Sequence, residues 1–267
     1  MNLAPRPLYI VSDAHLGAGS DADERLKSSR LRGFFKRVTD QGADLVILGD
    51  LFDFWFEYKN AIPRFHFDHL MALRDLVKAG RHVYYVAGNH DFWAGPFLQG
   101  ELGVTYCEDE LVLEHSGRRI CLAHGDGWPP NERAYRFMKR VFRNRAAIAL
   151  FRMISPDIGF PLARWLSHRS RGRHHLPQGT LDVYADLARR RLLAGVDLVV
   201  IGHLHECRHV RWPEGEWIIG GDWIKHFSYT VVDASGARLC LWRDEGADVR
   251  VDPVDSEPVS RQAARGG

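Results

Sequence analysis

Five short groups of Asp, His and Asn residues follow apolar runs in this chain, and these residue types bind divalent metal ions. The groups are Asp13-Ala14-His15, Gly49-Asp50-Leu51-Phe52-Asp53, Gly88-Asn89-His90-Asp91, His124-Gly125-Asp126 and Gly202-His203-Leu204-His205. One such group alone is more simply explained as a turn or a solvated strand end. Five of them predict a common site at the carboxyl edge of a sheet, where open α/β folds bind ligands.

The donor types indicate a pair of divalent cations. Two cations about 3.5–4 Å apart need a carboxylate between them, with imidazoles, carboxylates and open positions around them. Asp50 is placed to bridge. One metal could be completed by Asp13, His15 and His205, and the other by Asn89, His124 and His203. Mixed nitrogen and oxygen donors without a thiolate favour Mn, Fe or Zn over Mg or Ca, and the residues do not choose among those three.

The elements that position these groups alternate between strands and helices. Apolar runs predict strands over 8–12, 44–48, 82–87, 119–123 and 197–201, and helical periodicity predicts helices near 22–41, 66–79 and 179–193. Further short strands are expected near 104–106 and 110–114, with Ser116-Gly117 as the turn of a hairpin. Residues 207–252 alternate in short segments separated by turns, which predicts antiparallel β structure.

The order of the five groups resembles a known family. Asp-x-His, Gly-Asp-x-x-Asp, Gly-Asn-His-Asp, His-Gly-Asp and Gly-His-x-His, spread over residues 8–233, are similar to the motifs of calcineurin-like metallophosphoesterases. The resemblance implies an α/β fold, a four-layered α/β/β/α sandwich with two central sheets. It also implies the same seven metal ligands and a phosphoesterase activity.

A strongly basic segment interrupts this order between residues 128 and 175. From Arg133 to Arg173 there are eleven Lys or Arg against one acid, Asp157, so the segment carries +10 in a chain of net charge +2. Large apolar residues alternate with the basic ones at helical spacing. We therefore expect a core of 1–127 and 176–254, a basic helical insertion or lid at 128–175, and a disordered polar tail at 255–267.

The charge and apolar content of the insertion limit its partners. A basic amphipathic helical element is typical of a membrane surface, or of a cap over an anionic and partly apolar substrate. A solvated helical subdomain is the plainer alternative. Nucleic acid is disfavoured because the apolar residues are mostly aliphatic, with few aromatic stacking platforms.

Within the superfamily, the chain most resembles the UDP-2,3-diacylglucosamine hydrolases of lipid A synthesis. The residues that carry this are Ser12-Asp13-Ala14-His15-Leu16-Gly17, the run from Gly49 to Trp55, Gly88-Asn89-His90-Asp91-Phe92, His124-Gly125-Asp126 with the insertion after it, and Gly221-Asp222-Trp223-Ile224. The resemblance implies cleavage of a UDP-linked, doubly acylated glucosamine to UMP and a lipid monophosphate. It also implies manganese as the usual metal, and a cytoplasmic protein peripheral on the inner face of the inner membrane.

Residue roles follow from the site and the resemblance. His90, with Asp53 fixing its tautomer, could donate a proton to the leaving oxygen, and His203 could neutralise phosphoryl charge. Substrate contacts are expected at Asn89, Glu132, Arg169, Arg171 and Arg173. One departure is that the best-known branch of these hydrolases has Arg where this chain has His90, the usual residue of the wider superfamily.

Two other functions are compatible with the same motifs. The chain could be a metallophosphoesterase for another phosphodiester, nucleotide, phosphoprotein or nucleic acid, although Phe54-Trp55 after Asp53 differs from the Arg of the protein phosphatases. It could also be a non-catalytic scaffold of the same fold, which the complete set of candidate ligands disfavours.

No run of about 18 apolar residues predicts a membrane span, and Met1 to Pro7 does not resemble a signal peptide. The four cysteines have no paired spacing and are expected to be reduced. The oligomeric state is not predicted.

Overall fold

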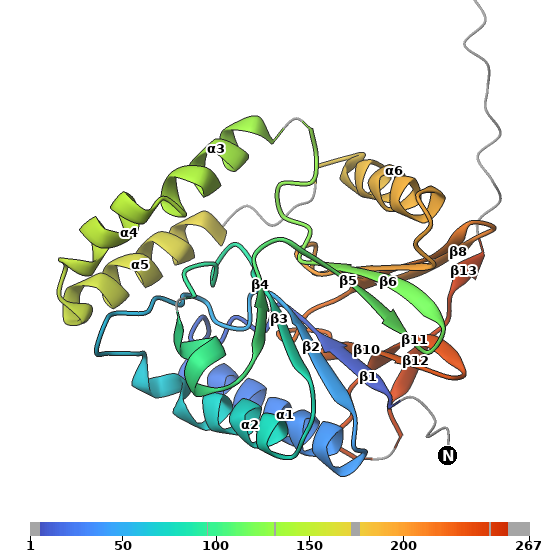
Figure 1. Cartoon of the computed structure of the whole chain (residues 1–267), viewed down its shortest axis with the longest axis horizontal. Helices are drawn as coiled ribbons and strands as arrows, with labels where there is room; N and C mark the ends of the chain where they lie inside the picture. The colour runs from blue at the N-terminus through green and yellow to red at the C-terminus, as the bar shows by residue number, and fades with distance from the viewer. Residues whose placement is uncertain (1–5, 95, 131, 172–176, 246, 256–267) are drawn as a thin grey trace, which may run out of the picture.

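Two β-sheets stacked between helices form the centre of the molecule (Figure 1). The computed structural model describes residues 6–94, 96–130, 132–171, 177–245 and 247–255, and for 134, 164 and 166–171 it describes only the backbone. Helices α1 (Asp21–Asp40) and α2 (Phe67–Lys78) cover the outer face of one sheet, and α6 (Thr180–Leu193) covers the other. The predicted four-layered α/β/β/α arrangement is confirmed.

The first sheet has seven strands in the order β12-β11-β10-β1-β2-β3-β4. Its parallel half contains β1 (Leu8–Val11), β2 (Asp44–Leu48), β3 (Val83–Val86) and β4 (Thr105–Cys107). Its antiparallel half contains β10 (Ser228–Asp233), β11 (Gly236–Leu241) and β12 (Val249–Val251). The carboxyl ends of β1, β2 and β3 therefore lie at one edge.

The second sheet has six strands in the order β13-β8-β9-β7-β6-β5. The strands are β5 (Glu110–His115), β6 (Arg118–Ala123), β7 (Leu198–Ile201), β8 (Cys207–Trp212), β9 (Gly215–Gly220) and β13 (Val254–Asp255). Strands β6, β7 and β9 are parallel neighbours, so this sheet also ends three strands at a common edge. Apolar side chains of both sheets, among them Ile10, Val46 and Val200, form the core between them.

Helix α1 shows how the sequence specifies a layer. Its buried residues Leu31, Phe34, Phe35 and Val38 recur at helical spacing and pack on the first sheet. Ser20 begins the helix through a capping box with Asp23, which satisfies exposed N–H groups of the first turn.

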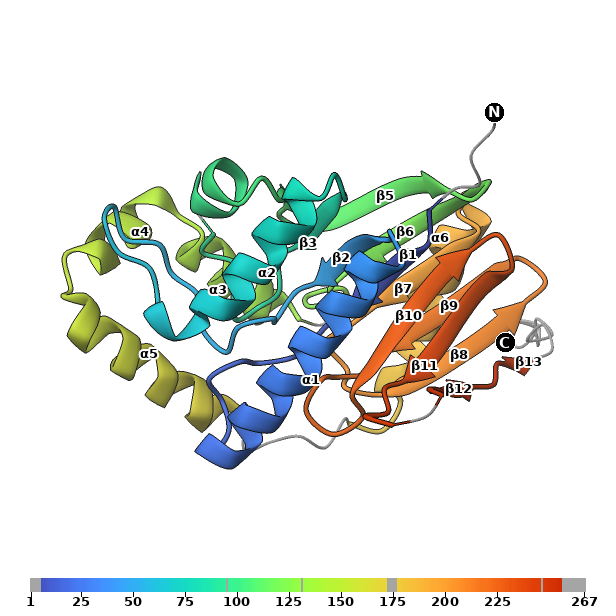
Figure 2. The same cartoon turned by 90° about the horizontal axis from the view of Figure 1, so that it is seen from below.

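The basic segment forms three helices that lie to one side, beyond the strand ends (Figure 2). They are α3 (Arg133–Phe142), α4 (Arg145–Arg152) and α5 (Pro156–Arg171), together called here the helical segment 133–171. No single helix in the described residues is long and apolar enough to cross a membrane. Helix α4 and residues 156–163 of α5 together reach that length and composition, but they are bent by 120°.

Most predicted elements agree with the structure to within one or two residues. The β5–β6 hairpin turns at Ser116-Gly117 as predicted, and the four cysteines are free thiols. Two short helices, Arg64–His66 and Phe97–Glu101, were not predicted. Asp255, assigned to the tail, pairs with Arg211 as the last residue of β13, and the rest of the predicted tail lies outside the described residues.

Candidate metal centre

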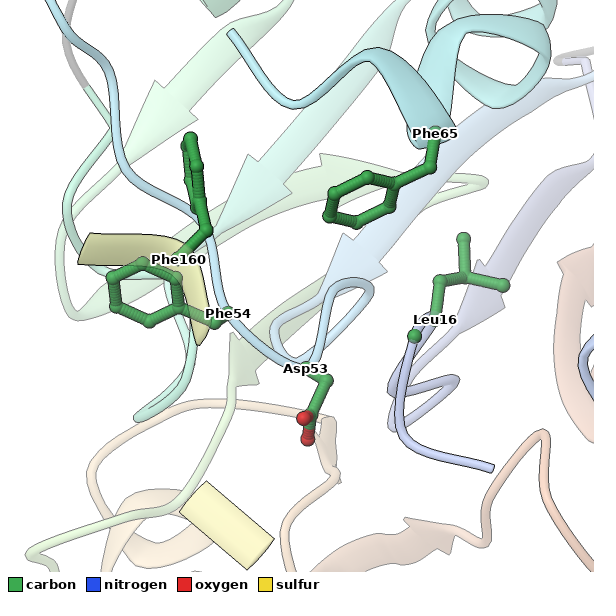
Figure 3. Close-up of a pocket in the computed structure, with 6 residues that line it drawn as sticks. Leu16, Asp53, Phe54, Phe65 and Phe160 are labelled. Carbon is green, nitrogen blue, oxygen red and sulfur yellow. The ribbon is translucent and has the colours of Figure 1, made fainter. Parts of the chain in front are cut away.

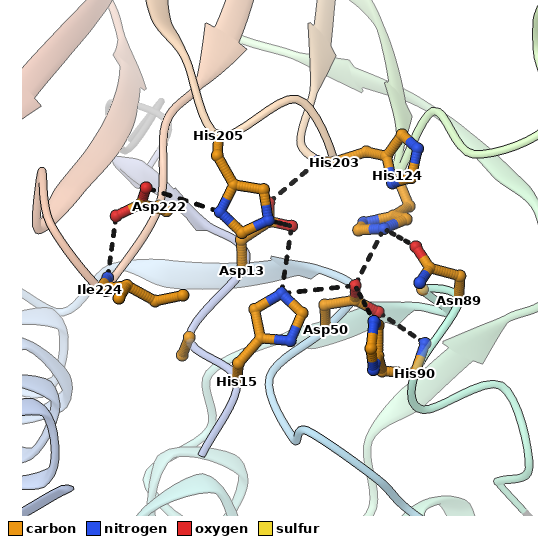
Figure 4. Close-up of polar contacts among 12 residues, drawn as sticks. Asp13, His15, Asp50, Asn89, His90, His124, His203, His205, Asp222 and Ile224 are labelled. Atoms are coloured by element: carbon orange, nitrogen blue, oxygen red, sulfur yellow. Dashed lines mark hydrogen bonds and ion pairs between the residues drawn. The ribbon is translucent and has the colours of Figure 1, made fainter. Parts of the chain in front are cut away.

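The loops that leave β1, β2, β3, β6 and β7 bring all seven predicted ligands into one cluster (Figure 4). The two sheets contribute from opposite sides, because their parallel strands end at the same edge of the sandwich. One side of the cluster is buried, because Asp13, His15, Asp50 and His124 are each at most 2% exposed, whereas Asn89, His203 and His205 are partly exposed.

Asp50 occupies the middle of the cluster. Its Oδ2 lies 3.4 Å from His124 Nε2 and 3.6 Å from His15 Nε2, rings that come from different sheets. Its Oδ1 accepts a hydrogen bond of 2.8 Å from the backbone N–H of His90. A carboxylate held in this way between two sets of imidazoles has the placement of a bridging ligand.

Asp13 gathers the second group of side chains. Its Oδ1 lies 3.6 Å from His205 Nε2 and 3.9 Å from His15 Nε2, while its Oδ2 accepts from the backbone N–H of His203 at 3.0 Å. The rings of His15 and His205 stack at 5.3 Å. Three donors therefore face one another on the side away from His124.

Asn89, His124 and His203 form the remaining side. Asn89 Oδ1 lies 3.0 Å from His124 Nε2, and the rings of His124 and His203 meet edge to face at 5.1 Å. The Nδ1–H of His124 donates to the carbonyl oxygen of Leu48 at 2.7 Å. This bond leaves Nε2 as the atom directed at Asp50.

The donor atoms fit divalent metal ions. Asp13 Oδ1 and His15 Nε2 are buried and have no hydrogen-bond partner in the described part of the chain, which is costly unless a cation takes that place. Three sets of ligand atoms lie within 4.8 Å of one another: Asp13, His15 and His205; Asp13, Asp50 and His124; and His15, Asp53 and His90. Nitrogen and oxygen donors without sulfur suit Mn, Fe or Zn.

The backbone at the cluster is strained. Asp13, His15, Asp50, His203 and His205 all have positive φ, between 42° and 67°, which non-glycine residues rarely adopt. The glycines before the ligands allow close approach. A Cβ on Gly88 would lie 2.0 Å from Asp50 Oδ1, and one on Gly202 would lie 2.6 Å from Asp13 Oδ2. The Gly-Asn and Gly-His motifs are therefore packing requirements of the site.

Opposite charges are paired inside the cluster. Burial raises the pKa of Asp50, but His124 and His90 outweigh it and hold the pKa well below its usual range. Burial likewise lowers the pKa of His124, but Asp50 outweighs it and raises that pKa well above the ordinary value. Burial, helped by His124, lowers the pKa of His203 to about 4, so this ring stays neutral and able to coordinate.

The geometry of His90 and Asp53 differs from the expected side-chain pair. His90 Nδ1 lies 2.9 Å from the backbone carbonyl oxygen of Asp53 and 3.8 Å from its Oδ1. The carboxylate of Asp53 lies between two rings, because its Oδ1 is also 3.6 Å from His15 Nδ1. His90 Nε2 is directed at the cluster, 4.0 Å from Asp50 Oδ2.

The predicted substrate contacts are only partly described. Glu132 Oε2 accepts from the backbone N–H of Gly127 at 3.0 Å, which ties the start of α3 to the loop after β6. Arg173 and the side chains of Arg169 and Arg171 lie outside what the structure describes.

Asp126, the last residue of the His124-Gly125-Asp126 motif, anchors the helical segment 133–171 beside the cluster. Its Oδ2 accepts from Tyr135 Oη at 2.7 Å and pairs with Lys139 Nζ at 2.8 Å. Lys139 also pairs with Asp109 at 3.3 Å. Helix α3 is thus fixed to the loop that carries His124.

A shallow apolar hollow lies next to the cluster (Figure 3). Phe54, Phe65 and Phe160 line it together with Leu16 and Asp53. Phe160 comes from α5, so the hollow lies between the core and the helical segment 133–171. Phe54 and Phe160 contact each other edge to face at 6.0 Å.

Two residues near the cluster were assigned no role from the sequence. Asp222, which belongs to the Gly221-Asp222-Trp223-Ile224 motif, follows β9 and has Oδ2 3.5 Å from His205 Nδ1, and its position after a strand was the available signal for a role. Lys27 is buried on α1, and its Nζ donates to the carbonyl oxygens of Ala14 and His15 at 3.1 and 2.7 Å. The sequence offered one sign of this burial, because Lys27 lies four residues before Leu31 and therefore on the same, buried face of the helix.

Comparison with known proteins gives consistent matches. The sequence pattern of the calcineurin-like phosphoesterases matches residues 6–207. A UDP-2,3-diacylglucosamine hydrolase of Porphyromonas gingivalis is 31% identical over 247 residues, covering 85% of this chain and 94% of that protein. Hydrolases of the same name from Neisseria meningitidis and Pseudomonas paraeruginosa are 29% and 30% identical, covering 96% and 97% of those proteins and 87% and 86% of this chain.

Proposed function

Because this chain belongs to the calcineurin-like phosphoesterases, we propose that it hydrolyses the pyrophosphate of UDP-2,3-diacylglucosamine to UMP and 2,3-diacylglucosamine 1-phosphate. The observation that carries the proposal is the complete cluster of seven candidate ligands around Asp50. The substrate follows from the names of relatives that align over nearly their whole length.

The cluster would hold two divalent cations, with manganese as the proposed metal. Asp13, His15 and His205 would bind one, Asn89, His124 and His203 the other, and Asp50 would bridge them. Bound cations of this kind acidify water for attack on phosphorus and neutralise phosphoryl charge. The residues at the common edge of the two sheets would position the phosphate so that attack and departure are in line.

His90 is the proposed proton donor to the leaving oxygen. Its Nδ1–H is held by the carbonyl oxygen of Asp53, so Nε2 is the ring atom turned towards the phosphate position beside Asp50. Asp53 would orient His90 through the backbone and His15 through its carboxylate. His203, which stays neutral, would bind the metal and would also contact the phosphoryl group.

The helical segment 133–171 is the proposed cover for the lipid part of the substrate. In this proposal the core comprises 1–127 and 176–254, and 128–175 is an insertion into it. The hollow between Phe54, Phe65 and Phe160 offers apolar walls beside the metal centre. Glu132, Arg169, Arg171 and Arg173 remain proposed contacts to the sugar and phosphates.

The same segment is proposed to rest on an anionic membrane surface at the cytoplasmic side. Leu150, Met153 and Ile158 are exposed by 68%, 82% and 62%, and Arg145 and Arg152 are exposed beside them. Exposed apolar tips among arginines suit a lipid interface, where each basic residue contributes about 1 kcal/mol.

The activity is tested by supplying Mn²⁺ and UDP-2,3-diacylglucosamine, with UDP-glucose and single-stranded DNA in parallel. We expect UMP release from the acylated substrate and little from UDP-glucose, followed by chromatography and mass spectrometry. Equal cleavage of UDP-glucose would indicate a general nucleotide pyrophosphatase, and cleavage of DNA a nuclease. No turnover of any phosphodiester after metal loading would favour a scaffold.

The membrane proposal has its own test. The variant with Leu150→Ser, Met153→Ser and Ile158→Ser should cosediment less with anionic vesicles than the unchanged chain, while turnover of a soluble phosphodiester stays the same. Leu193→Ser on α6, where the leucine is 67% exposed, is the matched control. Equal sedimentation of all three proteins would contradict a role for these side chains.

A further inference from the structure

We infer that Asp222, directly after β9, is a positioning residue that holds the ring of His205 so that its Nε2 faces the metal shared with Asp13. The inference rests on the proposed two-metal function. Asp222 is 2% exposed, and it follows β9 in the same way that the ligands follow the neighbouring parallel strands. Its side chain lies beside the ring of His205 (Figure 4).

The two carboxylate oxygens of Asp222 have different partners. Oδ1 accepts from the backbone N–H groups of Ile224, Lys225 and His226 at 2.9, 2.6 and 3.0 Å. Three such bonds fix the plane of the carboxylate and close the turn after β9. Oδ2 faces two imidazoles and lies 3.5 Å from His205 Nδ1.

This contact decides which atom of His205 can coordinate. A carboxylate oxygen accepts only, so Nδ1 carries the proton when it faces Asp222. The lone pair then lies on Nε2, which is 3.6 Å from Asp13 Oδ1. A carboxylate behind a ligand imidazole fixes its tautomer and increases its basicity as a donor.

The two metal positions differ in this respect. His124 donates its Nδ1–H to a neutral partner, the carbonyl oxygen of Leu48, whereas His205 donates to a carboxylate. Removing the charge of Asp222 should therefore weaken the metal bound by Asp13, His15 and His205 more than the other metal.

Local packing leaves Asp222 little room to move. A Cβ on Gly221, whose φ is +78°, would lie 2.0 Å from Ser228 Oγ, so only glycine fits before Asp222. Ser228 Oγ accepts from the backbone N–H of Asp222 at 3.1 Å and donates to the carbonyl oxygen of Gly220 at 2.7 Å. The carboxylate is thus placed by the turn, independently of any ligand.

A second imidazole approaches the same oxygen. His226 Nδ1 lies 3.1 Å from Asp222 Oδ2, and the His226 side chain is 38% exposed. Removing this ring leaves the His205 contact in place. A role through His205 therefore predicts that His226→Ala binds metal as the unchanged chain does.

Asp222→Asn separates the positioning role from the structural one. The amide oxygen can still accept from the three backbone N–H groups, while the amide nitrogen cannot accept from His205 Nδ1. Asp233→Asn is the matched control, because Asp233 Oδ1 likewise closes a turn by accepting from Ser235 N–H at 2.8 Å, at the opposite end of the sandwich.

Mn²⁺ binding is measured on each variant by competition with a chelator, with electron paramagnetic resonance to distinguish coupled pairs from single ions. In Asp222→Asn one equivalent should bind about 10–100-fold more weakly and the other unchanged, so the coupled signal is lost at limiting Mn²⁺. His226→Ala and Asp233→Asn should match the unchanged chain.

The inference would be overturned if Asp222→Asn binds both Mn²⁺ equivalents with affinities within twofold of the unchanged chain, or if both affinities fall equally. Either result would leave the proposed function standing. Weakening by His226→Ala to the same degree would also overturn it. An unchanged chain that binds fewer than two Mn²⁺ would overturn the proposed function, and the inference with it.

Discussion

Replacing His90 by alanine tests the chemistry of the site without removing a predicted ligand. Of the three imidazoles around Asp50 Oδ2, His90 is the most distant, at 4.0 Å against 3.4 and 3.6 Å for His124 and His15. Both metals should therefore stay bound in His90→Ala. The ring that donates a proton to the leaving oxygen is lost, so turnover should fall.

The size of the fall depends on the leaving group. A positioned acid contributes about 10²–10⁴-fold, which is about 2.7–5.4 kcal/mol of the barrier. Cleavage of a pyrophosphate expels a phosphate monoester with a second pKa of about 6, a weak base that needs little protonation. We expect a loss of about 10²-fold with the acylated UDP-sugar, and of about 10⁴-fold with an alkyl phosphodiester, whose leaving alkoxide is strongly basic.

Single-turnover rates on both substrates, with metal content measured on the same samples, provide the comparison. His115→Ala is the control, because His115 ends β5 at the edge of the sheet away from the cluster. A loss of one metal equivalent in His90→Ala would make His90 a ligand. Equal losses of rate on the two substrates would refute the assignment of His90 as the proton donor.

Three further predictions concern other parts of the molecule. Asp50→Asn should lower turnover by about 10³-fold or more, about 4 kcal/mol, because the bridge loses its charge, and near-normal rates would contradict the site. Burial, aided by Arg32, lowers the pKa of His69 to about 4. The unfolded chain takes up this proton below about pH 6.5, so up to about 3 kcal/mol of stability should be lost between pH 6.5 and 4. Urea unfolding of His69→Leu should show a flatter pH dependence there, and an unchanged slope would count against the burial argument. Lys139→Met leaves the buried carboxylate of Asp126 with Tyr135 alone, so limited proteolysis within 143–160 should become faster, whereas Lys139→Arg should resemble the unchanged chain.

The strand ends were predictable because two local signals coincide there. An apolar run identifies each buried strand, and a glycine with an acid, amide or imidazole marks where it stops. Parallel strands bring such ends to one edge, so the convergence of Asp13, Asp50 and His124 followed from topology once the fold was recognised. The hairpin at Ser116-Gly117 was predictable for a similar local reason.

The contacts behind the ligands were not predictable from local pattern. Asp222 reaches His205 from the end of the neighbouring strand β9, and Lys27 reaches the Ala14 and His15 carbonyls from α1, so each contact depends on which elements become neighbours in the fold. The partner of His90 proved to be a backbone carbonyl of Asp53, an atom that every residue has and that no side-chain pattern can mark.

The positive φ angles of five candidate ligands set stability against activity. Each such conformation costs on the order of 1–3 kcal/mol for a residue with a side chain, and glycine or asparagine adopts it more readily. Replacing His205 by asparagine, for example, should relax the loop after β7 while removing a metal donor. Selection for thermal stability alone would therefore favour substitutions at these ligand positions. Such substitutions would raise the stability of the protein and abolish its activity.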